Sequence, residues 1–470
     1  MNIKRLTQIL LPALALAFLC SAQTTPPSPA HQQLTAWLAA YDGTNFNAYL
    51  DFLDKNFVVP PRGGYRDPAF RDRTGGFDLK KIEQETPIQI TALLADRSTD
   101  DFSRVTIEVE PAEPHRILHL KQDLIERPPE FAIPRLNDPD LIVALRNKLD
   151  AESAADKFSG AVLVAHHGKP IFAQAYGLSD RERNIRNTPH TTFSIASMNK
   201  MFTAVATMQL VQAGKISLND PLNKYLPDYA NKDLAAKVTI AQLLTNTAGT
   251  GDIWGPEFDA HRAQLHTIQD YINLYGTRPL RFEPGSRYEY SNYGFFLLGA
   301  VIQKVSGEDY YTYIRNHIYR VASMTSSGSA PDDIAVKDRS IDYTKMGSPT
   351  WIPNGESATN GTPAGGGYST IGDMLNFANA LEQNKLLNPH FTKLLATPQV
   401  KNPFGMDSYG FGVQTINGNQ CFGHNGSSRG VNGDLEVCAA ANYTVVVLAN
   451  IDPPVAEDAA HFIINRLPAP

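Results

Sequence analysis

Strand-like segments lie at both ends of the region 160–450, and a long helix-rich stretch separates them. The segments with apolar alternation or apolar runs typical of strands cover residues 160–165, 171–176, 410–416, 420–424, 431–439 and 443–448. Between them, residues 218–387 are mostly helical in pattern and rich in loops. Because every strand needs a hydrogen-bonded neighbour, we predict one sheet that is completed by both ends of this region.

A smaller unit precedes this region. Three prolines between 128 and 134 mark a linker, so the second domain is predicted to span 137–470, with Asp138 capping a helix that ends near Lys157. Residues 31–125 show helical patterns at 34–41 and 46–57, followed by strand patterns at 88–94, 104–109 and 116–120. This order predicts a small α+β domain, which loosely resembles an NTF2-like cone. We expect its arginines, Arg62, Arg66, Arg71 and Arg73, to be solvated.

The N-terminus has the pattern of a secretory signal. Lys4 and Arg5 precede an apolar run, 9–19, that is too short to cross a bilayer, and small residues follow at 20–22. We predict a signal peptide at 1–22, a periplasmic or secreted protein, and no stable membrane span after cleavage. The alternative is lipidation at Cys20, which the bulky residues Phe18 and Leu19 disfavour.

Charge and cysteine content limit the partners and the compartment. The formal net charge of −6 and the lack of a basic tract argue against nucleic acid as a partner. After cleavage two cysteines remain, Cys421 and Cys438, at equal distances from a predicted hairpin turn near Arg429 and Gly430. They are expected to face each other across two antiparallel strands, either as a disulfide or as two buried thiols.

Ser197-Met198-Asn199-Lys200 is the only Ser-x-x-Lys in the chain, and it opens a predicted helix. That helix is expected to have one apolar face, formed by Met201, Ala204, Val205, Met208 and Val211. Residues three apart on a helix are neighbours, so Lys200 can reach the Ser197 hydroxyl. The positive end of the helix dipole favours loss of the hydroxyl proton. The alternative is that Ser197 caps the helix and Lys200 is solvated, since short motifs often occur by chance.

Two other segments offer the groups that an activated serine needs. Tyr290 can act as a base if an ammonium lowers its pKa, and Asn292 can hold Lys200 by a hydrogen bond. His424, at the end of a predicted strand, can donate or accept. Gly426 allows a ligand to lie against the strand, and the amide of Ser427 can join that of Ser197 as an oxyanion pair.

Spacing alone does not select these residues. Tyr-x-Asn also occurs at Tyr229 and Tyr271, His-x-Gly also at His166, and Lys-x-Gly at Lys345. Their contexts, namely loops, an amphipathic helix and a hairpin turn, favour structural roles. The pair His166-His167 is a weak metal-site candidate, so we predict no metal and no cofactor.

Six motifs in order carry a resemblance to a known family. They lie at 193–200 (Phe-Ser-Ile-Ala-Ser-Met-Asn-Lys), 243–249 (Leu-Leu-Thr-Asn-Thr-Ala-Gly), 284–285 with 290–292 (Pro-Gly, Tyr-Ser-Asn), 364–370 (Ala-Gly-Gly-Gly-Tyr-Ser-Thr), 423–426 (Gly-His-Asn-Gly) and 445–450 (Val-Val-Val-Leu-Ala-Asn). The stretch from about 158 to 450 resembles the serine β-lactamase-like superfamily, in the branch of class C β-lactamases, D-aminopeptidases, DD-carboxypeptidases and esterases.

The resemblance implies an antiparallel sheet flanked by helices, a helical subdomain, and an active site at their junction. It implies Ser197 as the acylated nucleophile and Lys200 as its activator. It implies Tyr290 as the general base and then the proton donor to the leaving group, and Asn292 as a ligand of Lys200 and of the substrate amide. His424 takes the position of a lysine in class C β-lactamases, where a cation meets a substrate carboxylate; a histidine does so only when protonated or as a neutral donor.

We therefore expect a serine hydrolase that forms an acyl-enzyme on small esters, or on peptides and amides with D-residues. The alternatives are a class C-like β-lactamase and a slowly acylating penicillin-binding sensor. The identity of the substrate, the oligomeric state and the role of residues 31–125 stay open at this point.

Overall fold

The computed structural model describes residues 26–329, 336–348, 350–354, 361–403 and 405–469. The predicted signal peptide, 1–22, and Cys20 lie outside the described residues. The chain separates into two compact units, Met1–Pro128 and Pro129–Pro470, and the predicted domains 31–125 and 137–470 each fall within one of them. Across the described parts of the chain, no helix is long and apolar enough to cross a membrane.

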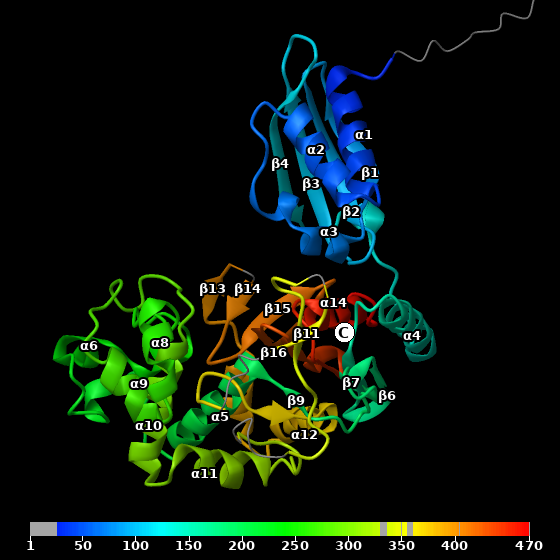
Figure 1. The fold of residues 1–470 in the computed structure, drawn as a ribbon. Coiled ribbons are helices and arrows are strands. Elements are labelled where there is room, and N and C mark those ends of the chain that lie inside the picture. The colour runs from blue at the N-terminus through cyan, green and yellow to red at the C-terminus, as the bar shows by residue number, and fades with distance from the viewer. Residues whose placement is uncertain (1–25, 330–335, 349, 355–360, 404, 470) are drawn as a thin grey trace, which may run out of the picture. The chain divides into compact units, whose positions relative to one another are not determined.

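The N-terminal unit packs helices against one face of an antiparallel sheet (Figure 1). Its elements are α1 (Pro29–Asp42), α2 (Phe46–Asn56), α3 (Pro68–Thr74), β1 (Phe77–Glu85), β2 (Gln89–Asp96), β3 (Phe102–Val109) and β4 (Ile117–Ile125), with the strands in the order β1-β2-β3-β4. Trp37 and Tyr41 of α1 are buried against alternate residues of the inner strands, such as Leu94 and Val105. The α+β prediction is confirmed for this unit, and the likeness to an NTF2-like cone stays a prediction.

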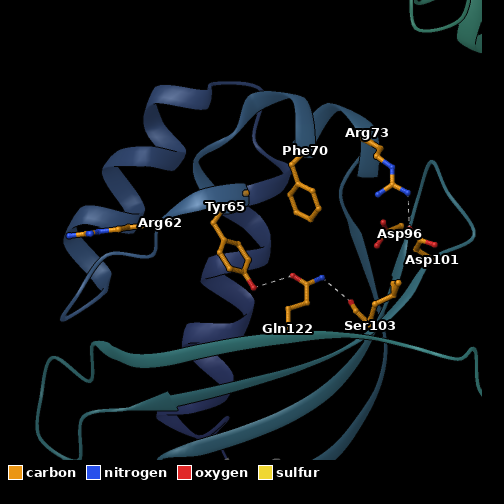
Figure 2. Close-up of a pocket in the computed structure, with 10 residues that line it drawn as sticks. Arg62, Tyr65, Phe70, Arg73, Asp96, Asp101, Ser103 and Gln122 are labelled. Carbon is orange, nitrogen blue, oxygen red and sulfur yellow. Dashed lines mark hydrogen bonds and ion pairs between the residues drawn. The ribbon is translucent and has the colours of Figure 1, made fainter. Parts of the chain in front are cut away.

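The N-terminal unit has a pocket of about 310 Å³, lined by polar and apolar side chains and shown in Figure 2. There Gln122 donates to the Ser103 hydroxyl at 2.9 Å, and Arg73 forms an ion pair with Asp101 at 3.0 Å. Arg71 donates to the carbonyl of Tyr41 at 2.6 Å, and Arg66 pairs with Asp54. Arg66, Arg71 and Arg73 are partly exposed, and each has a partner within the unit. That these arginines are solvated rather than part of a ligand site stays a prediction.

One eight-stranded antiparallel sheet organises the second unit. Its order is β13-β14-β15-β16-β17-β18-β5-β6, and the strands span Val400–Asn402, Gly405–Asp407, Gly412–Ile416, Asn419–Ser428, Val431–Cys438, Tyr443–Ala449, Gly160–His166 and Lys169–Tyr176 in that order. Strand β18 pairs with β5, with Val447 opposite Val162. The prediction that both ends of the region complete one sheet is therefore confirmed.

Helices cover both faces of this sheet. On one face, α4 (Asp138–Ala154) and α14 (Val455–Ile464) pack with the apolar side chains of β5 and β18. On the other face lie α5 (Asn199–Gln212) and α12 (Ile371–Glu382), and beyond them a helical subdomain. The subdomain holds α6 (Lys232–Lys237), α7 (Ile240–Leu244), α8 (Pro256–His261), α9 (Ile268–Tyr275), α10 (Asn292–Ser306) and α11 (Tyr310–Ile314). This matches the predicted antiparallel sheet flanked by helices.

The remaining regular elements are short. They are α13 (Pro389–Leu395), β7 (Leu178–Asp180), β8 (Ile185–Arg186), β9 (Phe193–Ser194), β10 (Tyr343–Thr344), β11 (Ile352–Pro353) and β12 (Tyr368–Ser369). Strand β9 pairs with β12, with Ser194 opposite Tyr368, so the segment that leads into Ser197 is held against the 364–370 motif.

Two local predictions needed correction. Helix α4 is capped by Asn137, whose side chain accepts from the amide of Asp140 at 3.0 Å, and not by Asp138. Asp138 instead accepts from Tyr443 and lies 2.8 Å from His166. Helix α5 was expected to bury one face, but it is buried on nearly every side because it lies between the sheet and the helical subdomain.

The two cysteines form a disulfide. Cys421 of β16 and Cys438 of β17 face each other with their Cα atoms 4.1 Å apart. Of the two alternatives left open by the sequence, the structure has the bonded one. The disulfide packs with α4 and α14, on the face of the sheet opposite to α5.

Candidate active site

Ser197 lies in a single 3₁₀ turn, Ala196–Met198, directly before α5. Ala196 has a φ of +43°, in the left-handed region that L-residues avoid. Neighbours on two sides hold this turn: a Cβ at Gly426 of β16 would lie 2.2 Å from the carbonyl oxygen of Ile195, and one at Gly365 would lie 3.4 Å from the carbonyl of Ala196. The tight turn therefore depends on glycines that let neighbouring chain segments approach it closely.

Lys200 lies one helical turn further on, with its side chain fully buried. Its Nζ is 3.2 Å from the Ser197 Oγ and 2.7 Å from the Asn292 Oδ1, and it also donates to the carbonyl of Ala364. Burial disfavours the ammonium form and lowers the pKa of Lys200 to about 7, although the charge of Asp252 opposes this change. A substantial fraction of Lys200 is therefore a neutral amine near pH 7.

Tyr290 donates a hydrogen bond from its hydroxyl to the Ser197 Oγ at 2.9 Å. The Lys200 Nζ lies 4.8 Å from the centre of its ring. Burial raises the pKa of Tyr290 above its ordinary value, and the charges of Asp252 and Asp407 act in the same direction. The condition under which the sequence allowed Tyr290 to act as a base, a pKa lowered by an ammonium, is therefore not met, because desolvation of the phenolate dominates. In this geometry Tyr290 is a neutral hydrogen-bond donor.

Asn246 fixes the backbone on both sides of Tyr290. Its carbonyl accepts from the amide of Glu289 at 2.8 Å, and its side-chain oxygen accepts from the amide of Ser291 at 3.1 Å. Its side-chain amide donates to Asp407 at 3.2 Å. Asn246 adopts a φ of +54°, which asparagine tolerates better than most residues. The 243–249 motif thus positions the tyrosine.

Asp252 is a site residue that the sequence analysis missed. Its two carboxylate oxygens accept from Asn292, one from the backbone amide at 2.8 Å and the other from the side-chain amide at 3.1 Å. This pairing turns the Asn292 Oδ1 towards Lys200. One signal was present: Asp252 is the sole acidic residue between Ile240 and Pro256 in the sequence, next to the 243–249 motif.

His424 lies on the face of β16 that faces α5, and its Nδ1 is within hydrogen-bond distance of the carbonyl of Asn425. Because a carbonyl can only accept, Nδ1 carries the proton and Nε2 of the neutral ring is an acceptor. Burial and the charge of Lys200 lower the pKa of His424 to about 4. The expectation that His424 can serve as a cation or a neutral donor is therefore corrected: near pH 7 the site gains an acceptor here.

Gly426 and Ser427 follow on the same strand. Gly426 is buried against Ile195 and Met198, and its role is the close approach described above. The Ser427 side chain points to the other face of the sheet, where its hydroxyl donates to Glu457 at 3.0 Å. Only the backbone of Ser427 can therefore serve the site, which is the role that the sequence predicted for it.

A cleft of about 710 Å³ opens at Ser197. Asn292, the 364–367 segment and residues 427–429 line it, together with side chains of α8 to α11. Of the predicted substrate-binding residues, Asn292 and Ser427 line the cleft. Within the described parts of the chain, no group of three or more His, Cys, Asp or Glu side chains could hold a metal ion.

Of the rival motif residues, Tyr229, His166 and Lys345 are not in the lining of this cleft, whereas Tyr271 is. Tyr229 bonds with the hydroxyl of Tyr293 at 2.9 Å, and Tyr271 stacks on Phe296. His166 faces Asp138, and Lys345 lies over the ring of Trp351 at 4.5 Å. Each has a structural environment of its own, so the structure brings together the residues that context selected.

This arrangement was compared with known proteins. The Beta-lactamase family profile matches residues 145–467, well over half of the chain. The chain belongs to the Beta-lactamase family. All of the predicted site residues, and Asp252, lie within the matched region.

This Beta-lactamase family member is also similar to individual curated proteins. A putative penicillin-binding protein, PbpX, of Bacillus subtilis is 30% identical over 253 residues, which are 54% of this chain and 62% of that protein. The chain thus spans about three fifths of the length of the curated relatives that it matches.

Two solved structures extend the comparison. A penicillin-binding protein from Bacillus halodurans has a TM-score of 0.60 and 32% identity, over 66% of this chain and 97% of that one. A D-stereospecific amidohydrolase from Streptomyces sp. has a TM-score of 0.59 and 26% identity, over 69% of this chain and 98% of that one.

Proposed function

We propose that this Beta-lactamase family member is a serine hydrolase that forms an acyl-enzyme on small esters, or on peptides and amides with D-residues. The observation that carries the proposal is that the Ser197 Oγ lies 3.2 Å from the Lys200 Nζ and 2.9 Å from the Tyr290 hydroxyl. A buried amine and a hydroxyl at these distances can take and return a proton. The similarity to a D-stereospecific amidohydrolase supports the substrate class.

Lys200 is the proposed base for acylation. A neutral amine has two N–H groups and one lone pair; Asn292 Oδ1 and the Ala364 carbonyl can accept from both N–H groups. The lone pair is then directed at the Ser197 hydroxyl. Lys200 takes the hydroxyl proton while the Ser197 Oγ bonds to the substrate carbonyl carbon, and the predicted amide pair of Ser197 and Ser427 stabilises the oxyanion.

Tyr290 is the proposed acid for the leaving group. Its hydroxyl donates a proton to the departing oxygen or nitrogen as the bond to the carbonyl carbon breaks, and it regains a proton from the Lys200 ammonium. Its raised pKa suits this role, because the phenol keeps its proton until the leaving group needs one. Water then attacks the carbonyl carbon of the acyl-enzyme: Tyr290 passes its proton to the neutral Lys200 and takes a proton from the water. The Lys200 ammonium then protonates the Ser197 Oγ as its bond to the carbonyl carbon breaks.

The compartment is also part of the proposal. We infer that the protein works in the periplasm or outside the cell, on the basis of the signal-like residues 1–22 and the disulfide between Cys421 and Cys438. Cell fractionation of the full-length chain, with N-terminal sequencing of the mature protein, tests this inference. A protein that stays in the cytoplasm with Met1 intact would contradict it.

Two covalent probes test the function. The mature protein and its Ser197→Ala variant are exposed to a fluorophosphonate and to a fluorescent penicillin. We expect labelling that depends on Ser197, and turnover of an ester or a D-amino amide; no Ser197-dependent label would contradict the nucleophile. Rapid turnover of penicillin would favour a β-lactamase, and stable labelling without turnover would favour a sensor.

A further inference from the structure

Apolar and aromatic side chains of the helical subdomain line part of the cleft, and polar side chains of the same region, namely Asp259, Arg262, His266 and Thr267, line it too. We call the following six residues the aromatic lobe: Trp254, Phe258, Ile268, Tyr271, Phe296 and Tyr311. They come from the 250–275 region, from α10 and from the start of α11. The cleft therefore offers both apolar and polar surface, with Ser197 in its lining.

The aromatic lobe lies next to Asn292, the residue that binds Lys200. Asn292 and Phe296 are four apart on α10, so they share one face of that helix. The Phe296 ring stacks on Tyr271 with centroids 3.8 Å apart and an angle of 22° between the planes. Trp254 follows Asp252, the partner of Asn292, by two residues. The lobe therefore begins within one helical turn of the side chain that binds Lys200.

Trp254 is unusually exposed for so large an apolar side chain. It is 64% exposed, although it packs edge-on against Phe258 with centroids 4.8 Å apart. Exposed aromatic surface on the wall of a cleft is typical of a place that an apolar ligand covers, because burial of that surface removes it from water.

Ser197 and Asn292 line the same cleft as the aromatic lobe. In the proposed function the acyl group stays on Ser197 after the leaving group has departed. The acyl group therefore lies in a cleft whose apolar surface is supplied by the lobe.

We propose that the aromatic lobe binds a large apolar acyl group, so that this enzyme prefers substrates with an extended aliphatic or aromatic acyl portion to acetyl or D-alanyl substrates. This proposal rests on the proposed function for the position of the acyl group. It adds the chemical class of that group, and it assigns the preference to the lobe, with Trp254 as the residue that the acyl group covers.

A series of 4-nitrophenyl esters, from acetyl to hexanoyl, tests the preference. We expect kcat/KM to rise at least roughly tenfold over the series, since each buried methylene can contribute about fourfold. In Trp254→Ala, the ratio of kcat/KM for hexanoyl over acetyl should fall by roughly tenfold. Val143→Ala, which truncates a side chain of α4 that is 59% exposed, is the matched control and should leave the ratio unchanged.

A binding measurement separates this proposal from the proposed function. Hexanamide and acetamide are titrated by calorimetry into the Ser197→Ala variant, which needs no turnover. At least roughly tenfold tighter binding of hexanamide, lost in Ser197→Ala/Trp254→Ala, would support the lobe even if no ester is hydrolysed. Equal kcat/KM across the esters, or equal affinity for the two amides, would overturn the lobe while leaving Ser197 labelling, and thus the proposed function, intact.

Discussion

Asp252 binds Asn292 with both of its carboxylate oxygens, one at the backbone amide at 2.8 Å and one at the side-chain amide at 3.1 Å. This double contact leaves the Asn292 Oδ1 facing Lys200, which donates to it at 2.7 Å. Asp252 therefore orients a residue that orients the base, without itself contacting Ser197.

We predict that Asp252→Ala lowers kcat/KM for esters by roughly tenfold or more, because Asn292 loses its fixed orientation. The same change removes a negative charge that raises the pKa of Lys200, so the acid limb of the pH profile should move to lower pH. Asp252→Asn, of equal size, should shift the limb in the same direction with a smaller loss of rate. A rate loss with an unmoved limb would show that Asp252 acts only on the fold.

The pH dependence of acylation follows from Lys200. The neutral amine is the base, so the reactive form is present above its pKa, which is about 7, and is lost below it. We expect the rate of Ser197 labelling to fall about tenfold for each pH unit below that value and to be level above it. His424, with a pKa of about 4, should add no limb in this range. A limb near pH 10 would contradict the lowered pKa.

Tyr290→Phe removes the 2.9 Å hydrogen bond to Ser197 and the proposed proton donor. We expect the hydrolysis of amides to fall by roughly 10²–10³, since an amine cannot leave unprotonated. Esters of 4-nitrophenol should lose less, because that leaving group departs as a stable anion. Steady-state kinetics on a matched ester and amide measure the difference, and equal losses on both would argue against Tyr290 as the acid.

Gly426→Ala tests the contact between β16 and the serine turn. A Cβ there would lie 2.2 Å from the carbonyl oxygen of Ile195, so the strand or the turn must move. We predict a loss of activity of roughly tenfold or more, together with a lower Tm. Gly372→Ala in α12, where the nearest neighbouring atom is 3.8 Å away, is the control and should change neither. Wild-type activity in Gly426→Ala would show that the contact is dispensable.

Part of this picture could be predicted from the sequence, and the missing parts have physical causes. Apolar periodicity was sufficient for the sheet built from both ends of the region. The grouping of Ser197, Lys200, Tyr290 and Asn292 came from the family resemblance that six motifs in order carry. Burial is not visible in a linear sequence, so the sequence left open whether an ammonium lowers the pKa of Tyr290, whereas in the structure burial raises it.

Two omissions have the same origin. Helix α5 reads as amphipathic from its larger apolar residues, but Thr203 and Thr207 on its other sides are buried too, since layers lie on both sides of it. Strand β1 was not predicted because its charged residues, among them Lys80 and Glu83, conceal the alternation. The burial of α5 and the formation of β1 both depend on tertiary packing, which a local sequence pattern does not show.

The most direct test of the account is to locate the acyl group. The mature protein is mixed with a 4-nitrophenyl ester, quenched in acid within the first turnover, digested, and mapped by mass spectrometry. The account predicts that the peptide containing Ser197 gains the mass of the acyl group, and that Ser197→Ala gains none. An acyl group on another residue, or release of product with no adduct at any time point, would contradict the acyl-enzyme at Ser197.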